Sequence, residues 1–164
     1  MKKKDHISVF QEYNHKDELE EKDKELYEKA GKILNRAYAP YSGFRVGCVV
    51  RLQSGKFISG TNQENAAFPS GMCAERVAVW NAGSNHPDDP IVSIAINGGN
   101  EQSEKLSAVS PCGGCRQVLA ELEEKSNSKI PILFPGANGK VIKVNSVEAL
   151  LPLMFKSADL NKGI

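Results

Sequence analysis

Apolar residues recur with two different periods along this chain, and the change of period predicts a succession of helices and strands. Over Asp17–Tyr38 they return every three or four positions while Glu and Lys fill the gaps, which is typical of an amphipathic surface helix. The runs Arg45–Gln53 and Lys56–Gly60 are more continuously apolar, and the Ser54-Gly55 turn between them predicts a β-hairpin.

Helices and strands alternate in the part of the chain that follows. We expect one helix to begin near Cys73, a strand to cover Ile91–Asn97, and a second helix to begin near Cys112. Strands that alternate with helices in this way indicate the α/β class.

The C-terminal part of the sequence predicts an antiparallel strand pair. The runs Ile130–Phe134 and Val141–Val144 are joined by a short, turn-rich segment, too short for the helical crossover that a parallel pair needs. A last helix, Val147–Met154, is expected to have Ser146 as its N-cap. The complete pattern predicts a three-layer α/β/α sandwich, with a five-stranded mixed sheet and helices on both faces.

Length and composition favour one domain. A chain of 164 residues that is 40% hydrophobic can close a single core without disulfide bonds. Residues 1–17 lack an apolar period and are rich in polar side chains, so we expect them to form a flexible N-terminal arm. The remaining residues, 18–164, are predicted to form the domain.

The charge balance restricts the class of partner. Lys and Arg total 21 against 20 Asp and Glu, so the net charge of +1 gives no electrostatic reason to expect nucleic acid, and a small neutral or zwitterionic ligand fits better. No apolar run approaches the roughly 18 residues of a membrane span, and no apolar segment follows the basic start. We therefore expect a cytoplasmic protein with no membrane partner.

Three of the four cysteines have the spacing of a metal site. In a cytoplasmic chain, the pair Cys112 and Cys115 indicates metal or redox use rather than a disulfide. These two and Cys73 lie at expected helix starts, where backbone N–H groups and the helix dipole favour thiolates. Three sulfurs could bind one zinc ion at about 2.3 Å and leave a fourth position open, as catalytic rather than structural zinc requires.

Glu75 is the candidate proton carrier. It follows Cys73 by two residues, so at the start of a helix its side chain can lean into the pocket without binding the metal. The alternative is that it only complements the dipole of its own helix. Cys48 is expected to be a small buried residue of a strand, and the three histidines fall in the arm or in a polar loop, so none of them is predicted to be a ligand.

The cysteine motifs resemble those of a known family. Cys73-Ala74-Glu75 and the later Pro111-Cys112-Gly113-Gly114-Cys115-Arg116-Gln117 are similar to the zinc deaminase signature. Cysteine in place of the histidine of that signature resembles the homotetrameric branch of the cytidine deaminase family. The resemblance runs from about Leu26 to the C-terminus, and its flanking motifs are Tyr41-Ser42-Gly43-Phe44, Asn62-x-Glu64-Asn65 and Leu150-Leu151-Pro152.

This resemblance implies a reaction. One Zn²⁺ per subunit would be held by the three cysteines, and a zinc-bound hydroxide would attack C4 of cytidine or deoxycytidine. Glu75 would shuttle protons to N3 and to the departing ammonia, which leaves uridine or deoxyuridine, a step of pyrimidine salvage. The resemblance also implies that Arg76 and Arg116 donate hydrogen bonds to the ligand sulfurs, although surface ion pairing is the alternative for both.

The family motifs also imply substrate contacts. By resemblance, Asn62 and Glu64 would bind the ribose hydroxyls, and Phe44 and the backbone of Ala74 would contact the pyrimidine. Phe68 and Phe155 would lie near the active sites of neighbouring subunits in a homotetramer. Loop capping for Asn62 and core packing for the aromatic residues remain alternatives. Gln63 and Phe68 depart from the aliphatic residue and the tyrosine that are usual at these places.

Three other functions remain open. A related deaminase could act on the nucleoside antibiotic blasticidin S, on a nucleotide, or on a base in nucleic acid. The motif Asn62-x-Glu64-Asn65 speaks against the antibiotic, and the resemblance places the last two strands of nucleic-acid editors parallel. A non-catalytic zinc-binding module would need a fourth protein ligand. A thiol redox protein of the thioredoxin type would have its Cys-x-x-Cys after the first strand, which is not where this sequence has it.

Overall fold

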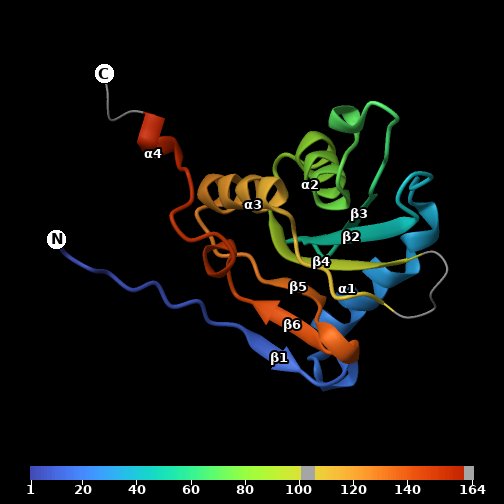
Figure 1. Ribbon diagram of the computed structural model, residues 1–164, viewed down its shortest axis with the longest axis horizontal. Helices are drawn as coiled ribbons and strands as arrows, with labels where there is room; N and C mark the ends of the chain where they lie inside the picture. Colours follow the sequence, from blue (N-terminus) through green and yellow to red (C-terminus); the bar gives the residue numbers. More distant parts are fainter. Residues whose placement is uncertain (101–105, 161–164) are drawn as a thin grey trace.

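A computed structural model describes residues 1–100 and 106–160 of the chain, whose centre is a twisted mixed sheet (Figure 1). Six strands lie in the order β1-β6-β5-β4-β2-β3, and only β4 and β5 run parallel to each other. The strands are β1 (Gln11–Tyr13), β2 (Phe44–Leu52), β3 (Phe57–Thr61), β4 (Ile91–Asn100), β5 (Ile132–Pro135) and β6 (Val141–Val144). The α/β class, the hairpin and the antiparallel last pair are confirmed.

The prediction of five strands was wrong by one. The additional strand, β1, lies within the predicted arm and pairs antiparallel with β6, where Gln11 is opposite Lys143 and Tyr13 is opposite Val141. A strand of three residues is too short to show an apolar period. The division into an arm and a domain stays a prediction, and the last four residues of that domain, 161–164, lie outside the described residues.

Helices cover both faces of the sheet, as predicted. Helix α1 (Glu21–Lys32) packs on one face against β2, β4 and β5, and α2 (Ala74–Asn85) and α3 (Gly113–Ser126) lie on the other. The two faces have separate cores: Ala95 of β4 packs with α1, whereas Ile94 and Ile96 pack with α2 and α3. This alternation follows from the period of two in a strand, and it places α2 and α3 side by side.

The last predicted helix is shorter than expected. Val147–Ala149 forms only a 3₁₀ turn, and a separate short helix, α4, covers Ser157–Leu160. Pro152 cannot continue a helix, and Leu153 has a left-handed φ of 56°, so the chain turns away between the two. The predicted cap is confirmed, because the Ser146 side chain accepts a hydrogen bond from the Glu148 N–H.

Gly60 lets helix α2 approach the hairpin closely. A Cβ atom at this position of β3 would lie 2.4 Å from the Ala78 nitrogen and 2.6 Å from the Ala74 oxygen, both of them backbone atoms of α2. Its partner across the ladder, Cys48, is fully buried in the same core, so its predicted role as a small core residue is confirmed. This pair of small residues packs against the first turns of α2.

Among the described residues, no helix combines the length and apolar character needed to cross a bilayer. All four cysteines have free thiols.

Candidate metal centre and active site

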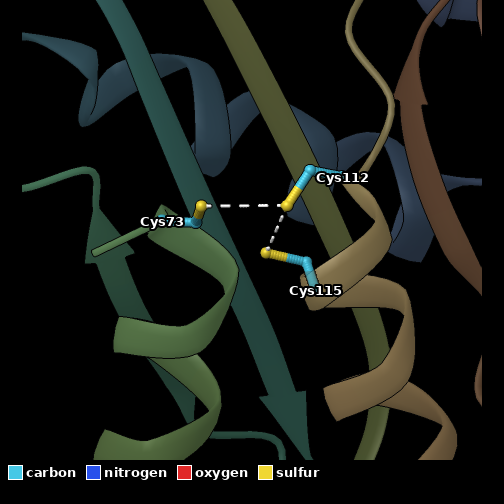
Figure 2. A group of neighbouring side chains, drawn as sticks. All are labelled: Cys73, Cys112 and Cys115. Atoms are coloured by element: carbon cyan, nitrogen blue, oxygen red, sulfur yellow. Dashed lines mark hydrogen bonds between the residues drawn. The ribbon is translucent and has the colours of Figure 1, made fainter. Parts of the chain in front are cut away.

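The three predicted ligand cysteines converge at the N-termini of α2 and α3 (Figure 2). Cys73 is the N-cap of α2, Cys112 is the N-cap of α3, and Cys115 lies in the first turn of α3. The Sγ atoms of Cys112 and Cys115 are 3.5 Å apart, and those of Cys73 and Cys112 are 3.9 Å apart. Two helix N-termini therefore direct their N–H dipoles at one cluster of sulfurs.

This geometry fits a tetrahedral zinc ion. Sulfurs bound at about 2.3 Å in tetrahedral geometry lie about 3.8 Å from one another, which is close to the two measured separations. The cluster contains no fourth His, Cys, Asp or Glu ligand from the described part of the chain. Three protein ligands leave one coordination position for water or substrate, so the site has the donor set of a catalytic zinc centre.

The sulfurs share protons unequally. A hydrogen bond from the Cys115 thiol, assisted by the Arg76 guanidinium, lowers the pKa of Cys73, and this interaction outweighs the opposing effect of burial. The same bond to Cys73, together with burial, raises the pKa of Cys115. The lowered pKa favours the thiolate form of Cys73, whereas a divalent ion that binds the cluster must displace the proton of Cys115.

The two arginines beside the ligands have different roles. Arg76 donates through Nη2 to the Cys73 sulfur at 3.5 Å, as predicted, and its guanidinium lies 5.9 Å from the centroid of the Trp80 ring. Arg116 was expected to contact a sulfur as well, but it instead donates to the Pro111 carbonyl at 2.8 Å and to the Leu150 carbonyl at 2.7 Å. It thus ties the segment that precedes Cys112 to the C-terminal turn.

Glu75 is buried beside the sulfurs. Only 5% of the residue is exposed, and burial is the main reason that the pKa of its carboxyl is raised, with the nearby Cys73 thiolate adding to the effect. A raised pKa makes it easier for a carboxylate to accept a proton and pass it on. Its position in the first turn of α2, buried beside the sulfurs but outside the ligand set, is the one that the sequence predicts for a proton carrier.

A cavity of about 480 Å³ opens from the metal centre, and Cys73 and Arg76 lie in its wall. Its other side is formed by the segments around Ser42 and Glu64, and it contains Asn62 and Phe68. Five of the sequence-predicted residues therefore meet around one space. Ala74 is fully buried beneath it, the Phe44 ring lies against β4 near Gly98, and Phe155 lies along α3, where its carbonyl accepts a hydrogen bond from Gln117.

Asn62 binds the first residues of β2, and Glu64 binds the turn that precedes this strand. The Asn62 amide donates to the Phe44 carbonyl at 2.9 Å and accepts from the Val46 N–H at 2.8 Å. The Glu64 carboxylate accepts from the Tyr41 N–H at 2.9 Å and from both the N–H and the hydroxyl of Ser42. The hydroxyl bond to Ser42 is the main reason that the pKa of Glu64 is lowered.

Ser42 had no predicted role, although its motif was noted in the sequence. A serine in a turn most often caps its own backbone, so the residue type alone did not indicate a partner that is 22 positions away.

Comparison with known proteins identifies the family. Residues 20–128 match the model of the cytidine and deoxycytidylate deaminase zinc-binding region. The chain belongs to this family. A cytidine deaminase of Halalkalibacterium halodurans is 35% identical over 136 residues, which are 83% of this chain and 96% of that protein. The family and the three-cysteine cluster together identify zinc as the cofactor.

Two further relatives extend the comparison. The crystal structure of a cytidine deaminase from Burkholderia pseudomallei has a TM-score of 0.67 and 34% identity, and the match covers 80% of this chain and 97% of that one. A blasticidin-S deaminase of Bacillus cereus is 29% identical over 139 residues, which are 84% of this chain and 94% of that protein. Family membership alone therefore does not select the amine that is hydrolysed.

Proposed function

We propose that this protein catalyses the zinc-dependent hydrolysis of cytidine and deoxycytidine to uridine and deoxyuridine with release of ammonia, a step of pyrimidine salvage. The observation that carries the proposal is the cavity that joins Cys73 of the metal centre to Asn62 and Glu64. An amide and a carboxylate can together bind the diol of a sugar, and they lie across the cavity from the place where the base would meet the metal. The relatives named cytidine deaminase support the same substrate class.

Glu75 can carry both protons that the reaction transfers. When bound, zinc acts as a Lewis acid that makes water a good nucleophile near neutral pH. Glu75 takes one proton from the attacking water and delivers it to N3 of the pyrimidine. It then transfers the second proton to the departing amino group, so that cytidine and water become uridine and ammonia.

The remaining site residues hold the nucleoside. Asn62 keeps one amide hydrogen free for a sugar hydroxyl, because its oxygen and its other hydrogen bind the backbone at the start of β2. The proposed roles of Phe44 and of the Ala74 backbone are contacts with the pyrimidine ring. Both residues adjoin the site, since Phe44 begins β2 and Ala74 begins α2.

A homotetramer is part of the proposal. Phe68 is 75% exposed at the cavity and Phe155 is 57% exposed beside α3, so both aromatic rings are available to neighbouring subunits. The proposed cytoplasmic location is supported by the four free cysteines, which a reducing compartment maintains.

Three observations bear on the alternative functions. The antiparallel β5–β6 pair is not the parallel arrangement expected of nucleic-acid editors. The blasticidin-S deaminase relative keeps that antibiotic as a second candidate substrate. The site does not offer the fourth protein ligand that a structural zinc module needs, within the residues described.

Turnover assays with the zinc-loaded protein test the proposal. Cytidine, deoxycytidine and blasticidin S are each supplied, and the loss of substrate absorbance is followed together with ammonia release. We expect stoichiometric ammonia from both nucleosides and a loss of activity when a chelator removes zinc. Turnover of blasticidin S alone would show that the antibiotic, and not a nucleoside, is the substrate. Turnover of none of the three would contradict the proposal.

A further inference from the structure

Ser42 makes more contacts with Glu64 than a capping serine needs. Its hydroxyl donates to Oε1 of Glu64 at 2.5 Å, and its backbone N–H donates to Oε2 at 3.2 Å. The Tyr41 N–H donates to the same Oε2 at 2.9 Å. The Ser42 hydroxyl also accepts a hydrogen bond from the Phe44 N–H at 3.0 Å, so its own orientation is fixed.

These contacts leave a defined part of the carboxylate available. A carboxylate has about four acceptor positions, and three are occupied by the turn. Glu64 and Ser42 both line the cavity that contains Cys73. Without the hydroxyl, only bonds to Oε2 would remain, and an exposed glutamate held at one oxygen can rotate about its side-chain bonds.

We propose that Ser42 is a positioning residue that holds the Glu64 carboxylate in the orientation that accepts a sugar hydroxyl of the nucleoside. This inference rests on the proposed function, because it assigns a purpose to the same cavity. The gain is preorganisation: the rotational freedom of Glu64 is already lost before the substrate binds, so binding does not have to restrict it.

The fold does not depend on this hydroxyl. The turn is closed by its own backbone bond, from the Gly43 N–H to the Ala39 carbonyl at 3.0 Å. The start of β2 that follows is held by Asn62, which bridges the Phe44 carbonyl and the Val46 N–H. Gly43 supplies the left-handed φ of 63° that the turn requires. Replacement of Ser42 by alanine therefore leaves the backbone in place and removes one restraint from the carboxylate.

The test compares Ser42→Ala and Ser42→Thr with two substrates, cytidine and 2′,3′-dideoxycytidine, which lacks both ring hydroxyls. We expect Ser42→Ala to raise KM for cytidine about fivefold with a smaller change in kcat. KM for dideoxycytidine should equal that of the wild type in each variant, because there is no hydroxyl for Glu64 to accept. Ser42→Thr keeps the hydroxyl and should restore the KM for cytidine.

Ser54→Ala is the matched control. Ser54 lies in the turn at the opposite end of the β2–β3 hairpin and also bonds an exposed carboxylate, that of Asp89. It should leave both KM values unchanged. Equal KM increases for the two substrates in Ser42→Ala, or no increase for cytidine, would overturn the inference while the proposed function stands. A wild-type protein that turns over neither nucleoside would overturn both.

Discussion

The first turn of α2 places three functional side chains in different environments. Cys73, as the N-cap, faces the other sulfurs, and Glu75 is buried beside them. Arg76 lies three residues after Cys73, which is close to one helical turn, and so returns to the same side and donates to its sulfur. Helical geometry alone therefore places the proposed metal ligand, the proposed proton carrier and a compensating positive charge within four residues.

A buried tyrosine gives a pH prediction at the residue scale. Tyr27 of α1 is 4% exposed, and burial raises its pKa to about 12. Because the neutral form is favoured in the folded state, the stabilising contribution is complete below the unfolded pKa of about 10. It is lost as the pH rises through the folded pKa.

An alkaline absorbance titration measures this directly. We expect a late phase of tyrosinate formation near pH 12, and we expect Tyr27→Phe to remove that phase only. A late phase that persists in the variant would assign it to another tyrosine.

The placement of the candidate metal ligands and of Glu75 could be predicted from the sequence, but the hydrogen-bond partners of Arg116 could not. The spacing of Cys112 and Cys115 and the local placement of Glu75 depend on helical repeat, so they could be predicted. Arg116 could not, because its preferred acceptors include the Leu150 carbonyl, which lies 34 positions away and is brought near only by the folded C-terminal turn.

At the scale of elements, the distance between α2 and β3 should control the metal centre. Gly60→Ala would place a methyl group within 2.6 Å of two backbone atoms of α2, so the helix must move. We expect a loss of about 1–3 kcal/mol in the free energy of unfolding, as is typical of overpacking, and weaker zinc binding because Cys73 moves with the helix.

Chemical denaturation and competition with a zinc chelator measure the two effects. Gly83→Ala on the same helix is the control, because a Cβ there meets no atom within 4 Å and alanine favours a helix. Unchanged zinc affinity in Gly60→Ala would contradict the link between this contact and the site.

The strand β1 should protect the edge of the sheet. It pairs with β6, while Tyr13 packs against the α1 core and Glu12 forms an ion pair with Lys140 at 2.5 Å. Deletion of residues 1–13 would leave β6 as an unpaired edge, and we expect a lower melting temperature and more aggregation with the zinc site intact.

Deletion of residues 1–9 is the control for this truncation, since these residues are exposed and precede β1. Thermal unfolding and light scattering of both truncated proteins distinguish the two cases. Equal behaviour of the two would show that β1 does not protect the edge.

The same elements show the limits of periodicity. The longer strands and the helices that begin near Cys73 and Cys112 were located correctly, but the first helix, expected over Asp17–Tyr38, is confined to Glu21–Lys32 with separate 3₁₀ turns on either side. The three-residue strand β1 and the break at Pro152 were missed, because pairing with β6 and a left-handed Leu153 are properties of the fold rather than of a repeating pattern.

For the molecule as a whole, the sheet separates two hydrophobic cores, and the candidate site residues all lie on one face of it. The cysteines, Glu75 and the cavity belong to the α2 and α3 face, while α1 closes the other face. The alternation of strands and helices predicted helices on both faces of the sheet, but not the sixth strand, which lies before residue 20, outside the part of the chain that matches the family model. The central claim is that zinc and Glu75 act together on a nucleoside.

The most direct test is the turnover of cytidine by the wild type and by Glu75→Gln, with equal zinc content confirmed for both. The amide has nearly the same shape but cannot carry protons, so we predict that kcat falls by about 10²–10⁴-fold while zinc stays bound. Turnover by Glu75→Gln at the wild-type rate, or none by the zinc-loaded wild type, would contradict the account.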